Sequence, residues 1–224
     1  MKNESNSELE NAIILNLKEL LKEKKILSCI AKSKNTSVEV LKELSLSKYI
    51  NIRNYVSNNK NITNDIRSIL STDPNYKIRR NISNNKHLSI DLINLFSKDK
   101  DWYVRNNIAI NINTPTNILI NLSKDNSNHV IASVAANPNT SVETLIELSK
   151  NKDELIRSKI AINIKTPSNL LSGLSTDKHS LVRYCVSKNP NTPIETLIEL
   201  CKDADPSIRM LALKSRENRL RLIK

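Results

Sequence analysis

The residue types that most often carry catalysis or bind metals are scattered in this sequence. Its histidines are His87, His129 and His179. None of them has a cysteine or an acidic residue at the spacing of metal ligands. The single glycine, Gly173, excludes the phosphate-binding loops that need two or more glycines. The closely spaced acids are Asp99 with Asp101 and Asp203 with Asp205. We interpret these acids as turn residues and arginine partners, and the sequence predicts no enzyme, no metal and no cofactor.

A second set of residues has the chemistry of a binding surface. Aromatic residues are scarce, yet the tryptophan and most of the tyrosines lie between positions 49 and 103, among basic residues. The candidate partner-binding residues are Tyr49, Tyr76, Lys77, Arg80, Lys100, Trp102 and Tyr103. This mixture suits a protein or peptide that is held by aromatic anchors. It also suits a nucleic acid, through phosphate charge and base stacking. The alternative is that Tyr76 and Trp102 only pack between adjacent turns.

Arginine recurs every 26 residues, and this period organises the elements that carry all of these residues. The arginines of the series are Arg53, Arg79, Arg105, Arg157, Arg183 and Arg209. Leu27 and Ile131 occupy its two other positions. An aliphatic residue precedes each position and an apolar residue follows three places later, so that both lie on one face of a helix. The arginines are therefore predicted to be structural.

Two further polar series share the period and are also predicted to be structural. An aspartate stands six residues before most positions of the arginine series, where its carboxylate and nearby carbonyls can bond a guanidinium. The aspartates are Asp73, Asp99, Asp125, Asp177 and Asp203. An asparagine follows the first helix of each repeat, where the chain reverses and needs a left-handed residue or a side chain that bonds exposed backbone. The asparagines are Asn59, Asn85, Asn111, Asn137, Asn163 and Asn189.

A second short helix follows each asparagine. Segments such as Thr192-Pro193-Ile194-Glu195 predict its start, with Thr192 as the N-cap and proline as the first helical residue. Leucine or isoleucine fills the apolar series of this helix in the other repeats, but Arg67 interrupts it. We therefore expect the repeat around Arg67 to be shifted, with Ile66 and Ile69 as its apolar residues.

The pattern resembles the leucine-rich repeat variant family. The resemblance rests on NPNTSVETLIEL at 137–148, NPNTPIETLIEL at 189–200, the aspartate six residues before arginine, and the arginine flanked by aliphatic residues. It covers roughly residues 26–213 and implies an all-α, right-handed α-solenoid of about seven to eight two-helix repeats without a β-sheet. One helix of each repeat is expected to be either α or 3₁₀. The N-terminal cysteine cluster of some members, which binds an iron–sulfur centre, has no counterpart here, because that half contains only Cys29.

Composition adds expectations about organisation and location. Residues 1–25 are predicted to form an amphipathic capping helix, with Leu9, Ile13, Leu17, Leu20 and Leu21 as its apolar stripe. Residues 26–213 would form the solenoid without an internal boundary, and residues 214–224 a basic tail that frays. The longest apolar runs are too short to span a membrane, and no signal peptide is evident. The three cysteines fit small buried thiols in a reducing cytoplasm.

These observations favour a cytoplasmic, non-enzymatic repeat scaffold that binds a protein or peptide, as a monomer or weak dimer. The alternative is a solenoid that contacts the phosphate backbone of a nucleic acid through a basic face, because the formal net charge is +12. Richness in lysine, asparagine and isoleucine also fits biased codon usage, which would leave part of that charge without meaning for function.

Overall fold

The computed structural model describes Glu19 and residues 22–222, without the side chain of Leu222. Every regular element within these residues is an α-helix, and neither a strand nor a 3₁₀ helix occurs among them. The chain divides into two compact units, the first ending at Asn85 and the second beginning at Lys86. The sequence predicted a solenoid over 26–213 without a boundary, and it gave no sign of this division.

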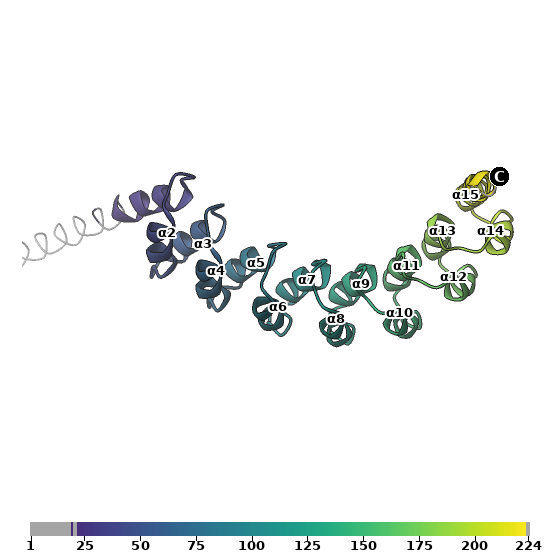
Figure 1. Ribbon diagram of the computed structural model, residues 1–224, viewed down its shortest axis with the longest axis horizontal. Coiled ribbons are helices and arrows are strands. Elements are labelled where there is room, and N and C mark those ends of the chain that lie inside the picture. Colours follow the sequence, from purple (N-terminus) through teal and green to yellow (C-terminus); the bar gives the residue numbers. More distant parts are fainter. Residues whose placement is uncertain (1–18, 20–21, 223–224) are drawn as a thin grey trace, which may run out of the picture. The chain divides into compact units, whose positions relative to one another are not determined.

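Short helices follow one another throughout both units (Figure 1). The first unit contains the helical stretch 22–32, α2 (Val38–Ser45), α3 (Ile50–Ser57), α4 (Asn64–Ser71) and α5 (Tyr76–Ser83). The second unit begins with α6 (Ile90–Phe96), α7 (Trp102–Ile110), α8 (Thr116–Leu122), α9 (Asn128–Ala136) and α10 (Val142–Leu148). It continues with α11 (Glu154–Ile162), α12 (Ser168–Leu174), α13 (Ser180–Lys188), α14 (Ile194–Leu200) and α15 (Pro206–Leu222). The predicted apolar stripe from Leu9 to Leu21 lies outside the described residues.

The predicted 26-residue repeat of two helices is confirmed. The first helices of successive repeats begin at residues 50, 76, 102, 128, 154, 180 and 206, and the second helices at 38, 64, 90, 116, 142, 168 and 194. Both helices are α-helical, which resolves the alternative between α and 3₁₀. Within the second unit, α7, α9, α11 and α13 lie side by side as an inner row on the concave side of the curve (Figure 1). Helices α8, α10, α12 and α14 form the outer row.

The core lies between the two rows because each helix buries one apolar stripe. In α7, Val104 and Ile108 are completely buried, and in the outer row Leu119 and Leu145 are completely buried. Isolated helices of seven to nine residues are unstable in water, so these helices depend on packing against their neighbours. Arg67 leaves the apolar stripe of α4 as predicted. Ile66 and Leu70 are buried there instead, and Ile69 is half-buried.

Arginine–aspartate pairs connect successive repeats in both units. In each pair the arginine Nε donates to one carboxylate oxygen of an aspartate 20 residues further along the chain, and NH2 donates to the other. The pairs and their Nε–Oδ2 distances are Arg53–Asp73 (2.6 Å), Arg105–Asp125 (2.6 Å), Arg157–Asp177 (2.6 Å) and Arg183–Asp203 (2.7 Å). The side chains of these residues are between 3% and 17% exposed. These arginines and aspartates therefore connect each repeat to the next through nearly buried ion pairs.

The predicted partner of each arginine was wrong in one respect. The residue six positions before the arginine contributes its main-chain carbonyl and not its carboxylate: Arg105 NH1 donates to the carbonyl of Asp99 at 2.7 Å. Each guanidinium thus joins the turn that precedes its own helix to the turn at the end of the next outer helix. The same carbonyl bond is made by Arg79 to Asp73 and by Arg209 to Asp203.

The asparagine series forms a second connection between repeats. Asn137 Nδ2 donates to the carbonyls of Ala109 (2.8 Å) and Asn111 (3.0 Å) in the preceding repeat, and its Oδ1 accepts from the Asn139 amide. Asn59, Asn163 and Asn189 make the equivalent bonds. No described residue has a positive φ, the single glycine included. The asparagines are therefore needed for their bonds to exposed backbone, and the left-handed alternative is wrong.

The threonines predicted as N-caps lie one residue before the observed N-cap positions. Thr192 is completely buried, and its hydroxyl donates to the carbonyl of Val186 at 2.6 Å, so it closes the preceding helix. The N-cap of α14 is Pro193. At the same position Ser141 and Ser89 accept bonds from the first turns of α10 and α6. Buried threonine was mistaken for a cap because both roles place a hydroxyl at the junction.

The end of the second unit differs from the predicted frayed tail. Helix α15 continues to Leu222, and the boundary placed after residue 213 falls inside it. Arg219 on α15 donates to the carbonyls of Thr192 and Asn189, the latter at 2.8 Å. At the equivalent positions of an earlier repeat, the carbonyls of Thr114 and Asn111 accept from Asn139 and Asn137 of the next repeat. One guanidinium thus replaces two carboxamides at the end of the series.

We expect Arg105→Ala to lower the free energy of unfolding by about 2–4 kcal/mol, because the buried Asp125 carboxylate loses its cationic partner and the Asp99 carbonyl loses its guanidinium donor. Urea unfolding followed by circular dichroism measures the change. Lys124→Ala, at an exposed lysine beside Asp125, is the control and should change it by less than about 0.5 kcal/mol. Equal effects of the two substitutions would contradict a structural role for Arg105.

Stability should fall in acid because of the paired aspartates. Burial opposes ionisation of Asp125, but hydrogen bonds from Arg105 and from the Ser127 amide lower its pKa overall. The pKa of Asp203 is lowered mainly by its hydrogen bond to Arg183. Since these folded-state pKa values lie below the unfolded value of about 3.9, the pairs contribute fully above about pH 5. Their contribution is lost as the pH falls through the lower folded-state values.

Urea unfolding at a series of pH values between 7 and 2.5 checks this expectation. Asp125→Asn, which cannot ionise at that position, should be less stable at pH 7 and should lose less stability on acidification. An acid dependence of Asp125→Asn that equals that of the original chain would show that Asp125 makes no contribution.

Candidate protein-binding surface

The predicted aromatic and basic residues are divided between the two units. In the first unit, Tyr76 is 43% exposed at the start of α5, and the Arg80 guanidinium lies 4.6 Å from its ring centre. Lys77, on the same helix, is exposed. Tyr49 is half-buried before α3, with Lys24 and Lys48 over its ring. Here the basic side chains cover the aromatic rings, which leaves less of the rings for a partner.

The remaining predicted residues lie in the second unit. Trp102 and Tyr103 are 39% and 43% exposed at the start of α7, with an edge-to-face contact at 5.5 Å between ring centres. Trp102 also stacks on His129 of the next inner helix, at 5.0 Å. Lys100 is exposed in the preceding turn. One face of Trp102 therefore packs against a neighbouring repeat, as the alternative interpretation predicted. Much of the Trp102 and Tyr103 side chains remains accessible.

A larger apolar surface lies at the opposite, C-terminal ends of the inner helices. It consists of exposed residues at the C-terminal ends of α7, α9 and α11 and in the turns that follow them. We call it the isoleucine surface, and its members are Ile110, Ile112, Ala136, Pro138, Ile162 and Ile164. The four isoleucines are 57%, 63%, 46% and 64% exposed, in that order. These side chains stand one position before and one position after the buried Asn111 and Asn163, so the asparagine bonds fix the backbone that presents them.

The isoleucine surface contains a groove. A hollow of about 430 Å³ is lined by Ile110 and Ile112 on one side and by Ala136 and Pro138 on the other. Ala132 and Ser133 of α9, Asn137 in the turn and Lys159 of α11 complete its lining. Ser133 Oγ bonds Asn106 Oδ1 of α7 at 2.7 Å, which connects the two helices below the groove. An apolar hollow with a few polar groups at its border is the usual form of a binding site.

The charges around the isoleucine surface have a single sign. The C-terminal parts of the four inner helices with their following turns are the segments 106–113, 132–139, 158–165 and 184–191. These segments contain three lysines, Lys159, Lys165 and Lys188, and no acidic residue. The surroundings of the surface therefore favour a partner that carries negative charge beside its apolar residues.

The outer row offers a weaker apolar surface. Ile120, Ile146 and Ile198 are 40%, 41% and 40% exposed, and they form a single line on α8, α10 and α14. Single exposed apolar residues of this kind are common on protein surfaces, whereas a contiguous patch with a groove indicates an interaction site. We therefore regard the isoleucine surface as the candidate site.

The residues that could perform catalysis or bind a metal were also located. No group of three or more histidine, cysteine, aspartate or glutamate residues that could hold a metal occurs among the described residues. Burial raises the pKa of the Cys185 thiol, which keeps it in the less reactive protonated form. Cys201 is half-buried, and Cys29 is exposed, contrary to the prediction that all three are buried. Asp101 caps α7, and Asp205 accepts from the Ser207 amide.

The sequence analysis did not predict the isoleucine surface. A signal for it exists. The asparagine series is flanked by Asn58 and Lys60 in the first unit, but by Ile110 and Ile112 and again by Ile162 and Ile164 in the second. Isoleucine on both sides of a turn asparagine departs from the polar residues that turns usually contain.

None of the helices in the described part of the chain is long and apolar enough to cross a membrane. No protein-family model matches the sequence. Among curated proteins, none matches it significantly.

A solved structure shares the fold. A leucine-rich repeat variant with a novel repetitive structural motif superposes with a TM-score of 0.63 at 21% identity, over 81% of this chain and 73% of that one. An engineered protein matches with a TM-score of 0.43 at 15% identity, over 86% of this chain and 72% of that one. The first match confirms the predicted resemblance at the level of the fold: this chain is an all-α solenoid of the leucine-rich repeat variant type.

Proposed function

We propose that this chain, which has the fold of a leucine-rich repeat variant, is a non-enzymatic binding protein whose isoleucine surface holds a segment of another protein. The observation that carries the proposal is the exposure of four isoleucines at the ends of the inner helices, at positions that the buried asparagines hold in place. Of these four, Ile110 and Ile112 line the groove. Burial of apolar surface is the main source of affinity in protein association, at about 25 cal/mol per Å².

The chemistry of the surface defines the partner. Ile110, Ile112, Ile162 and Ile164 would bury apolar side chains of the partner, while Lys159 and Lys188 would face acidic residues beside them. We therefore propose a short peptide segment with two or more large apolar residues and flanking acidic residues. Repeat proteins commonly present such extended surfaces to partners.

Nucleic acid binding remains the second prediction, and it rests on the net charge and on the aromatic and basic residues between positions 49 and 103. An apolar surface does not match a phosphate backbone, and basic residues of the first unit already contact tyrosine rings. A nucleic-acid complex would weaken steeply with salt, whereas apolar peptide binding would not. Titration of a labelled duplex at two salt concentrations separates the two.

The proposal is tested with peptides selected on the full-length chain from a random peptide library. Their affinities are then measured for the original chain, for Ile162→Glu on the inner row and for Ile146→Glu on the outer row. The two isoleucines are 46% and 41% exposed, so the variants are closely matched. We expect Ile162→Glu to weaken binding by more than about tenfold, through lost apolar burial and repulsion of acidic residues. Ile146→Glu should change it by less than about twofold.

The enriched peptides should also contain acidic residues beside leucine, isoleucine, phenylalanine or tryptophan. Equal loss of affinity in both variants, or none in Ile162→Glu, would contradict the placement of the site. Circular dichroism and thermal unfolding of the two variants confirm that each is folded before its affinity is compared.

A further inference from the structure

Arg67 occupies a position that is apolar in every other repeat of the chain. The equivalent residues in the other second helices are Leu41, Ile93, Leu119, Leu145, Leu171 and Leu197, all 2% exposed or less. Arg67 is half-buried there, and the turn of α4 that carries it buries Ile66 instead. A cation in this place costs solvation energy, which a purely structural residue such as leucine would not. Its presence therefore calls for a physical reason.

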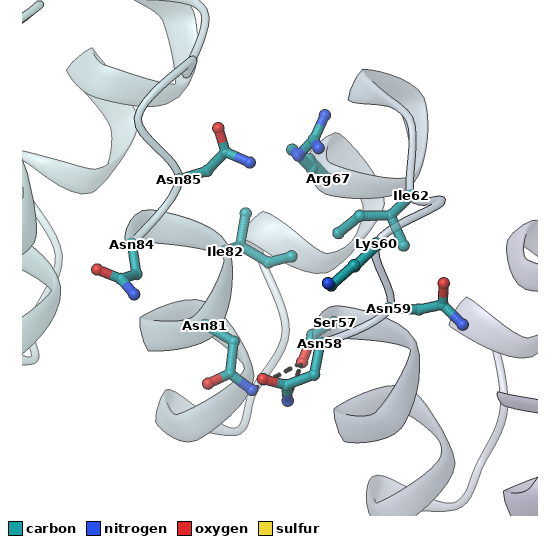
Figure 2. A pocket seen from close by; sticks show the side chains of 10 residues that line it. All are labelled: Ser57, Asn58, Asn59, Lys60, Ile62, Arg67, Asn81, Ile82, Asn84 and Asn85. Carbon is teal, nitrogen blue, oxygen red and sulfur yellow. Dashed lines mark hydrogen bonds between the residues drawn. The ribbon is translucent and has the colours of Figure 1, made fainter. Parts of the chain in front are cut away.

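Arg67 lines a polar pocket within the first unit (Figure 2). The pocket has a volume of about 320 Å³ and lies among the C-terminal ends of α3 and α5, the turn 58–63 and α4. Lys60 extends from the turn into the middle of the pocket, and the Arg67 guanidinium lies at its edge, near the amide of Asn85 (Figure 2). Ser57, Asn81 and Asn84 are among the other lining residues, and none of the ten is acidic.

Among the described residues, no acidic group neutralises the two cations of the pocket. Arg67 has one side-chain hydrogen bond, from NH1 to Asn64 Oδ1 at 2.9 Å, although a guanidinium has five donors. Neither Arg67 nor Lys60 pairs with a carboxylate in the part of the chain that the structure describes. Burial lowers the pKa of Arg67, and no acidic group offsets this effect. The arginines of the regular series differ, since the hydrogen bond that Arg53 donates to Asp73 raises the pKa of Arg53.

We infer that this pocket is a binding site for a phosphate group, with Arg67 and Lys60 as its charged ligands. The Arg67 fork can donate two parallel bonds to phosphate oxygens, and the Lys60 ammonium supplies a second positive charge. The pocket holds roughly ten times the volume of a water molecule, so a phosphate fits together with bridging waters.

Phosphate is favoured over a carboxylate by charge and by the number of donors. A carboxylate carries one negative charge and two oxygens, and Arg67 alone would satisfy it. Two cations without an acidic neighbour match the charge of about −1.5 to −2 that a phosphate monoester carries at pH 7. The phosphate can belong to the free ion or to a phosphorylated side chain, and both present the same group to Arg67 and Lys60. This inference is independent of the isoleucine surface, which lies in the other unit.

Thermal unfolding of the full chain in inorganic phosphate tests the inference, with chloride at the same ionic strength as the reference. Phosphate at about ten times its Kd should raise the Tm of the unit that contains the pocket by roughly 2–4 °C. Arg67→Leu restores the residue type of the other repeats. It should raise the Tm in chloride and abolish the response to phosphate. Lys60→Gln should raise the Kd for phosphate about tenfold or more, as measured by titration calorimetry.

Lys77→Gln removes an exposed charge of the same unit outside the pocket and is the matched control, with an expected change in Kd of less than twofold. O-phospho-L-serine is the second ligand: tighter binding than inorganic phosphate identifies a phosphorylated side chain as the source, and equal or weaker binding identifies the free ion. Phosphate also stabilises many proteins without a site. An equal rise in Tm in the original chain and in Arg67→Leu would therefore overturn the inference, as would an unchanged Kd in Lys60→Gln.

Discussion

The bidentate bond between an arginine of one repeat and an aspartate of the next is the interaction on which this structure depends. Each guanidinium also bonds the carbonyl six residues before it, so that it joins three segments of two repeats. A lysine could not do this, because it lacks the planar fork. The net energy of a buried ion pair is often small, whereas the loss of one partner is costly. The pair therefore fixes the register of the repeats as well as contributing to their stability.

The asparagine series completes this arrangement and explains why the surface can be varied. Helices of seven to nine residues have little stability of their own, and the polar bonds hold their ends against the next repeat. Residues beside the asparagines are then free to differ, from Asn58 and Lys60 in one unit to Ile110 and Ile112 in the other. Both candidate sites arise where such positions depart from the common pattern, either in the turn or, for Arg67, within the helix.

Much of the fold could be predicted from the sequence because the repeat determines it. The period, the two helices and the structural role of the arginines follow from residues that recur every 26 positions. The partner of each arginine could also have been found. Where the series lacks arginine, at Leu27 and Ile131, the residue 20 positions later is Ser47 or Asn151 and not aspartate. The helix starts were displaced because a buried threonine and an N-cap serine look alike in a sequence.

The candidate sites were harder to predict, for physical reasons. Exposure depends on which helix row a residue belongs to, and the period alone does not distinguish the inner row from the outer one. Trp102 and Tyr103 were predicted to bind a partner because they are aromatic, but ring contacts with neighbouring side chains occupy part of their surface. The interruption at Arg67 was visible in the sequence. The anion site could be inferred only from the pocket and from the absence of an acidic partner of Arg67 among the described residues.

The central claim is that paired charges couple one repeat to the next, and a double-mutant cycle at Arg157 and Asp177 measures that coupling directly. Both side chains are 9% exposed, which makes this pair well shielded from solvent. The free energies of unfolding of Arg157→Ala, Asp177→Ala and the double variant should reveal a coupling of about 1–3 kcal/mol. The same cycle with alanine at Ile131 and Asn151, the equivalent positions without charges, provides the reference. Additivity within about 0.5 kcal/mol at Arg157 and Asp177 would contradict the account.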